Sequence, residues 1–528
     1  MPALAGPAAP EPLDRPYAPL MTLMGGPLQG TLREDEVARI ATTFQFVNGH
    51  GGMGERYWAG PSAGRDAQGR TIGERLKAAN PDFILSNYRN GSYIAQNCPH
   101  EAAEVEAAFP LGIAVWETGC RLVRPLGAED TRLVLEPPPG RSRGAAPIRP
   151  FKASTTTAEH SRSVKEYVAW LRLGDELLRI DAARATPEGR IEMEVRRGLW
   201  NTRATAHGLE TRVLQPIYVG SVRAGADVSL SGVPDSTAPQ PGLRYALQQQ
   251  DPGFHRWLGD KCAAIFNEGY DVVWLDVTAS AFYNNGDAHG QPVVPWDVAA
   301  GKPLDASTYR EQQQLKIDAL FQRFPRGQFF INNVKERAYF DNGEERRFFT
   351  GEQGHHPVSG GAMEFYANTR NEREWRSLAA MTLDMVKSGF WAVAWAKGEG
   401  QAGTNYLRFA YGTYLMAYEP GARLLFGFGH GVRAKPPAFL YSDLGQPLKR
   451  LSNIADAKHP SQPVLYQREF SQARVLVNPE PRPGGPVTLE REFYDPDAAA
   501  LVREVTLAPL SAKLLLIPAT DRKPPSAP

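Results

Sequence analysis

The chain has 528 residues, of which 42% are apolar and 22% are charged, a composition typical of a globular protein with an ample core. This length exceeds one ordinary domain, so two or three domains are expected. The 59 basic and 58 acidic residues leave a net charge of +1, which excludes the broad positive field of proteins that bind nucleic acid or anionic membranes.

The two ends and the cysteines narrow the class further. Residues 1–16 are rich in proline and alanine and lack the basic start and apolar core of a signal peptide, so they predict a disordered leader. A disordered tail is expected over 521–528. Three cysteines are too few for a disulfide scaffold, and no apolar run approaches the roughly 20 residues that cross a bilayer. We expect a protein that stays inside the cell, or one secreted with a signal that this sequence lacks, and the oligomeric state stays open.

The first half of the chain predicts strands of two kinds. Short apolar runs at 20–24 or 43–47, at 82–86 and at 215–219 are typical of buried strands. Between 115 and 212 the pattern changes to short extended runs separated by turns, with a proline-rich loop at 137–150. This change predicts an inserted β-rich domain.

A regular alternation of helix and strand begins near residue 251. Asp251 and Pro252 suit a helix start, apolar residues then recur at helical spacing, and Gly269 ends the helix. The strand YDVVWLDVT follows at once, and further strands are predicted at 328–333, 362–366, 390–395 and 423–428.

About eight such strands predict a (β/α)8 TIM barrel over 17–114 and 213–431. The strand-rich region 432–520 predicts a C-terminal β-sandwich. The main alternative is an open doubly wound sheet, but the glycines after 43–47 lack the dinucleotide spacing.

Two acidic residues lie in or at the end of apolar runs of the predicted barrel. Asp276 ends the run VVWLD, and Glu364 lies in the short apolar run AMEFY. Carboxyl ends of barrel strands form the catalytic face, and two carboxylates there can cleave a glycosidic bond, one as nucleophile and one as general acid/base. Glu352 and Glu399 are alternatives for the acid. A structural role for Asp276, as a turn cap or an arginine partner, stays open.

Polar and aromatic residues at the ends of several predicted barrel strands predict a sugar-binding surface. The candidates are Tyr88, Arg89, Tyr283, Asn284, Asn332, Asn333, Trp395 and Lys397. No metal site is predicted, because the adjacent His355 and His356 cannot chelate as an i, i+4 pair does. No nucleotide, serine-hydrolase or metalloprotease motif occurs either.

The layout resembles bacterial glycoside hydrolases with a (β/α)8 barrel and a C-terminal β-sandwich, including families related to the α-amylase superfamily. The resemblance rests on residues 272–276, 361–365, 406–429 and 505–516. It implies a carbohydrate substrate, no cofactor, Asp276 as nucleophile and Glu364 as acid/base. The insertion at 115–212 departs from the amylase plan, and the histidine and arginine subsite motifs of that family are missing, which leaves the sugar open.

The predicted function is therefore cleavage of an oligosaccharide or polysaccharide by a retaining mechanism through a covalent glycosyl-enzyme on Asp276. A transglycosylase with the same site is one alternative. A carbohydrate-binding barrel without activity and an isomerase or aldolase barrel are the others.

Overall fold

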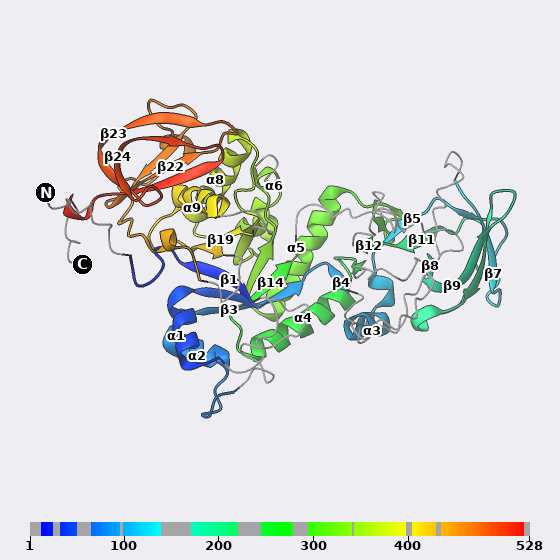
Figure 1. Cartoon of the computed structure of the whole chain (residues 1–528). Helices are drawn as coiled ribbons and strands as arrows, with labels where there is room; N and C mark the ends of the chain where they lie inside the picture. Colours follow the sequence, from blue (N-terminus) through cyan, green and yellow to red (C-terminus); the bar gives the residue numbers. More distant parts are fainter. Residues whose placement is uncertain are drawn as a thin grey trace. The chain divides into compact units, whose positions relative to one another are not determined.

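The structure is a computed structural model of the chain, and it forms two compact units (Figure 1). Unit 1 contains residues 1–89, 262–278 and 324–528, and unit 2 contains 90–261 and 279–323. The residues that the structure describes are 12–24, 32–49, 65–95, 99–138, 170–219, 244–276, 278, 294–340, 343–397, 404–428 and 435–521.

Eight parallel strands close into a barrel, which confirms the predicted fold class. In order around the barrel they are β1 (Leu20–Met24), β2 (Phe46–Gly49), β3 (Ile84–Asn90), β14 (Val272–Asp276), β17 (Gln328–Asn332), β18 (Gly360–Glu364), β19 (Trp391–Ala396) and β20 (Leu424–Phe428).

The early strands differ from the prediction in two ways. Residues 20–24 and the run near 43–47 were alternatives, but both supply a strand, β1 and β2. The run at 215–219 supplies none, because β11 (Val213–Pro216) and β12 (Tyr218–Val219) pair with strands of other sheets. An apolar run is equally buried in either sheet, so its composition could not reveal its partner.

Helices alternate with the barrel strands along the chain. They are α1 (Glu34–Thr43), α2 (Ile72–Ala79), α4 (Pro252–Asn267), α5 (Ala306–Arg323), α6 (Glu336–Phe340), α7 (Arg346–Thr350), α8 (Glu372–Lys387) and α9 (Thr404–Ala417). Local chemistry explains their starts: the Asn371 side chain accepts from the Glu374 backbone N–H at the start of α8, and Thr71 and Glu74 form a capping box at the start of α2.

The barrel interior is built in layers. Met21, Phe46, Trp274, Phe330 and Leu425 are among the buried residues that fill it, and the rings of Phe46 and Phe330 stack with centroids 5.7 Å apart. Side chains two positions apart on a strand share a face, so the next residues along each strand point inward as well. We call these next inward positions the mouth layer: Asn48, Ser86, Asp276, Asn332, Glu364 and Trp395, of which Trp395 also belongs to the buried core.

Unit 2 is rich in antiparallel strands, as the sequence predicts for 115–212. Its largest sheet has the order β5-β11-β8-β9-β10-β7-β6. Because β11 belongs to this sheet and β12 pairs with β13, the β-rich region extends past the predicted boundary at 212. The remaining elements of unit 2 are α3 (Pro99–Ala108), β4 (Tyr93–Ala95), β5 (Val115–Glu117), β6 (Arg121–Leu122), β7 (Arg132–Glu136), β8 (Trp170–Leu173), β9 (Glu176–Ala185), β10 (Ile191–Arg196), β13 (Arg244–Ala246), β15 (Trp296–Asp297) and β16 (Lys302–Pro303).

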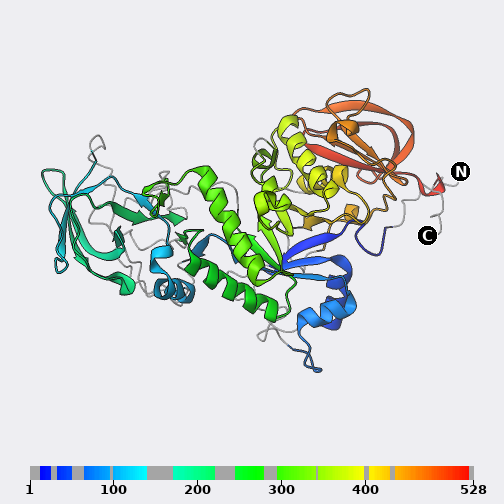
Figure 2. The same ribbon diagram turned by 180° about the vertical axis from the view of Figure 1, so that it is seen from behind.

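The C-terminal region folds as one five-stranded antiparallel sheet in the residues described. Its order is β21 (Tyr466–Glu469), β22 (Ala473–Asn478), β25 (Ser511–Leu516), β23 (Gly484–Asp495) and β24 (Ala500–Leu507). Helix α9 packs against β22 and β25 (Figures 1 and 2). A Cβ on Gly412 of α9 would lie 2.5 Å from the Ala512 Cβ, so this close approach requires glycine. A two-sheet sandwich stays a prediction.

Candidate active site

Asp276 and Glu364 lie at the carboxyl ends of the fourth and sixth barrel strands. Val272, Val273, Trp274 and Leu275 are 0% exposed, and Asp276 is the first residue of β14 that is only partly buried. Glu364 ends β18 in the same way, with a side chain 16% exposed. Both carboxylates therefore reach the mouth layer from strands separated only by β17.

Asn332, at the end of β17, bridges the two carboxylates. Its amide Nδ2 donates to Asp276 Oδ1 over 2.8 Å and to Glu364 Oε2 over 2.9 Å. If each oxygen accepts one of the two amide hydrogens, which diverge by about 120°, the oxygens are about 5 Å apart. One neutral side chain thus fixes the spacing of two acidic groups.

Tyr88 and Lys397 complete the polar contacts of the pair. The Tyr88 hydroxyl on β3 donates to Asp276 Oδ2. Lys397, directly after β19, donates from Nζ to Glu364 Oε1 over 2.8 Å. The same ammonium lies 5.1 Å from the ring centroid of Trp395 and 5.4 Å from that of Phe365, so aromatic faces also hold its charge.

The backbone turns sharply just after two of these residues. Asn333 follows Asn332 with φ 65°, and Phe365 follows Glu364 with φ 59°. Such left-handed conformations are costly for residues other than glycine and persist only where the surroundings enforce them. Here the Tyr366 N–H donates to the Trp395 carbonyl over 2.9 Å, and the Tyr406 hydroxyl donates to the Tyr366 carbonyl over 2.7 Å. These bonds hold the turn that ends β18.

The structure brings together Asp276, Glu364, Asn332, Tyr88 and Lys397 of the predicted residues, and Trp395 lies beside them, 4% exposed. Arg89 follows Tyr88 on β3, so it lies on the opposite face of that strand. Asn333 is 8% exposed and adjoins the bridge. Tyr283, Asn284 and Glu399 lie outside the described residues.

Glu352 has a different setting from Glu364. It lies in a single-turn helix before β18 begins, where the Arg347 side chain approaches it to 3.4 Å and the Thr350 hydroxyl donates to it over 3.1 Å. Its side chain is 49% exposed. A residue that precedes a barrel strand enters from the end opposite the catalytic face, so Glu352 does not share the setting of Asp276 and Glu364.

Two members of the mouth layer, Asn48 and Ser86, are absent from the sequence-based candidates. Each is 1% exposed and stands two positions after a residue that packs in the barrel core, Phe46 or Ile84. The alternation of inward positions on β2 and β3 was the available signal.

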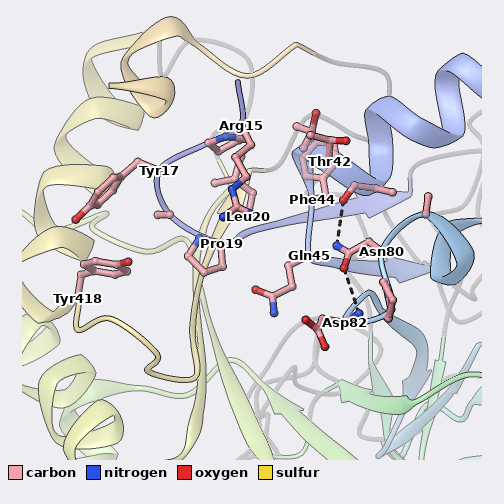
Figure 3. Close-up of a pocket in the computed structure, with 16 residues that line it drawn as sticks. Arg15, Tyr17, Pro19, Leu20, Thr42, Phe44, Gln45, Asn80, Asp82 and Tyr418 are labelled. Carbon is pink, nitrogen blue, oxygen red and sulfur yellow. Dashed lines mark hydrogen bonds between the residues drawn. The ribbon is translucent and has the colours of Figure 1, made fainter. Parts of the chain in front are cut away.

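A cavity of about 470 Å³ lies at the opposite end of the barrel (Figure 3). It is lined by residues at the starts of β1 to β3, among them Leu20, Gln45 and Asp82, together with Tyr17 and Tyr418. It therefore does not include the two carboxylates.

Clusters of metal ligands and membrane-spanning helices are both absent from the described ranges. Within them, no group of three or more His, Cys, Asp or Glu side chains is placed to hold a metal ion. None of the helices described there is both long and apolar enough to span a membrane.

Comparison with known proteins gives only distant similarities. No protein-family model matches the chain, and no curated protein is detectably similar to it in sequence. Solved structures that align with it include a β-L-arabinopyranosidase of glycoside hydrolase family 27 from Geobacillus stearothermophilus, at 11% identity over 96% of this chain and 98% of that one, with a TM-score of 0.35. Another is a trehalose-6-phosphate hydrolase from Bacillus licheniformis, at 10% identity over 95% and 99%, with a TM-score of 0.38. These values are too low to assign a family, so the strand pairing itself defines the fold.

Proposed function

We propose that the chain is a glycoside hydrolase that cleaves an oligosaccharide or polysaccharide with retention of configuration. The observation that carries this proposal is the Asn332 bridge between Asp276 and Glu364. It supports a spacing of about 5 Å, close to the ~5–5.5 Å of retaining enzymes and below the ~6.5–9.5 Å of inverting ones.

In this mechanism Asp276 attacks the anomeric carbon and Glu364 protonates the leaving oxygen. The products of the first step are a covalent glycosyl-aspartate and the released alcohol. Glu364 then takes a proton from water, which attacks the anomeric carbon, and Asp276 leaves as a carboxylate. The two steps account for every atom and proton, and neither requires a cofactor.

The neighbouring residues have roles that follow from their contacts. Tyr88 and Asn332 each donate to one oxygen of Asp276, so the carboxylate is held with both oxygens as acceptors. Lys397 donates to Glu364 and holds its carboxyl group in place beside the point of cleavage. The Lys397 side chain is 34% exposed, so it can also contact substrate at the rim.

The test is chemical rescue of carboxylate variants on a panel of 4-nitrophenyl glycosides. We expect Asp276→Ala to lose about 10⁴-fold or more in kcat/KM and to regain turnover with added azide, forming a glycosyl azide of inverted configuration. Glu364→Ala should lose about 10²–10⁴-fold, less for good leaving groups, and azide should give a product of retained configuration.

The matched control is Glu352→Gln, an acidic residue outside the bridge, which should stay within about twofold of the wild type. If Asp276→Ala gave the retained azide and Glu364→Ala the inverted one, the two residues would have the opposite roles. Full activity in both alanine variants would reject the proposal.

A further inference from the structure

Several polar atoms in the mouth layer are buried without a hydrogen-bond partner. In the described part of the chain, Asn48 Oδ1, Ser86 Oγ, Asn332 Oδ1 and Trp395 Nε1 all belong to this group. The parent residues are 1%, 1%, 3% and 4% exposed. Buried polar groups are almost always paired because an unpaired one costs desolvation energy, so four in one layer call for a physical explanation.

These four atoms lie beside the carboxylate pair. Asn332 is the bridge itself, and Trp395 carries the ring under the Lys397 ammonium. Asn48 on β2 and Ser86 on β3 are direct neighbours in the register of these two strands. Gly427 on β20 leaves space for the Trp395 indole, because a Cβ there would lie 2.8 Å from the Trp395 Cδ1. The unpaired atoms therefore line the same barrel end as the two acids.

All four atoms belong to uncharged groups. Two are amide oxygens that accept, one is an indole N–H that donates, and one is a hydroxyl that does both. Recognition of an anion requires a free cation or a cluster of N–H donors, whereas Lys397 already pairs with Glu364. With Glu364 protonated for the first step, the charges of Asp276 and Lys397 cancel, so the described site has no net positive charge to attract a carboxylated or phosphorylated sugar.

We infer that Asn48, Ser86, Asn332 Oδ1 and Trp395 form the subsite for the sugar ring at the point of cleavage, and that this sugar is uncharged and bears free hydroxyls. The inference rests on the proposed function and adds the substrate class to it. Sugar hydroxyls both donate and accept, so they can pair with all four atoms and remove their desolvation cost. At the same end of the barrel, Asp276 and Glu364 are only partly buried.

The experiment measures sugar binding, which requires no turnover. The full chain is titrated calorimetrically with neutral aldoses and with the matching hexuronic acids and 6-phosphohexoses. We expect the best neutral sugar to bind at least tenfold more tightly than its acidic counterparts. Asn48→Leu and Ser86→Ala should each weaken that binding at least about fivefold without lowering the midpoint of thermal unfolding.

Deoxy sugars locate the contacts. Each deoxy sugar lacks one hydroxyl. If that hydroxyl pairs with the replaced side chain, the variant should bind this deoxy sugar less than twofold more weakly than the wild type does. Trp395→Phe should behave like the other two variants. Its matched control is Trp170→Phe, since the buried Trp170 indole in unit 2 is also unpaired in the described structure. This control should bind the sugar as the wild type does.

Three outcomes would overturn the inference: tighter binding of the acidic sugars, wild-type affinity in the Asn48 and Ser86 variants, or no binding of any neutral sugar at 100-fold excess over the protein. Wild-type affinity in the variants would mean that buried water satisfies these atoms. Failure of the proposed function appears separately, as unchanged hydrolysis in the Asp276 and Glu364 variants.

Discussion

At the scale of single residues, the most informative side chain is Asn332. Its amide can donate two hydrogen bonds, and the structure uses both on carboxylates. An ionised carboxylate at this position could only accept, and it would place a second negative charge directly beside Asp276. The site therefore depends on an amide here, although asparagine and aspartate have the same shape.

We predict that Asn332→Asp lowers kcat/KM by about 10²–10³-fold, because like charges at this distance repel and the bridge is lost. Steady-state kinetics on the best aryl glycoside measures the effect. Gln328→Glu is the control, since it adds the same charge to the exposed start of the same strand and should change the rate less than twofold. A variant with normal kinetics would show that the bridge is not needed.

At the scale of elements, the last turn of helix α9 is hydrogen-bonded to the C-terminal sheet. Arg468 on β21 donates to the carbonyls of Leu415 and Met416 over 2.9 and 2.8 Å, and to Glu419 over 2.6 Å. Its side chain is 2% exposed. A cation here satisfies carbonyls that the end of a helix leaves unpaired.

We predict that Arg468→Ala lowers the free energy of unfolding by about 3–5 kcal/mol, because it leaves Glu419 and two carbonyls without their donor. Chemical denaturation followed by circular dichroism measures the change. Arg503→Ala in the same sheet removes an arginine that is 71% exposed and 3.8 Å from Glu492, and it should stay within about 0.5 kcal/mol. Equal effects of the two variants would contradict this role of Arg468.

At the scale of the whole molecule, the two units have separate stabilising networks. In unit 2 the Glu176 carboxylate is 0% exposed and accepts from Arg197 over 2.6 and 2.7 Å and from His207 over 2.8 Å. Burial alone raises the pKa of Glu176, but the bonds from Arg197, Thr205 and His207 outweigh it and lower the pKa below 4.5. Such a group adds stability above its unfolded pKa, and the addition is lost as the pH falls through the folded pKa.

We predict that Glu176→Gln destabilises unit 2 by about 3–5 kcal/mol at pH 7 and flattens its loss of stability on acidification below about pH 5. Hydrogen exchange read separately for peptides of the two units measures this, and the peptides of unit 1 should be unaffected. Glu192→Gln, on the same sheet but 38% exposed, is the control. If the stability of unit 2 fell equally steeply with pH in both variants, Glu176 would not be the cause of its acid sensitivity.

The barrel strands from β14 to β20 could be predicted from residue pattern, because wholly apolar runs that alternate with amphipathic helices can only be buried between layers of helices. It also predicted that Asp276 ends such a strand, whereas it placed Glu364 inside the run 362–366 and the structure ends β18 at Glu364. These are local properties of the chain, and they can be predicted from the types of residues and their spacing.

Which strands are neighbours, and which side-chain atoms come into contact, became known from the folded chain alone. It assigned residues 213–216 to the sheet of unit 2, joined the two acids through Asn332, and placed Asn48 and Ser86 in the same layer as those acids. Pairing between strands far apart in the chain depends on the closure of the whole barrel, and no short stretch of sequence contains that information.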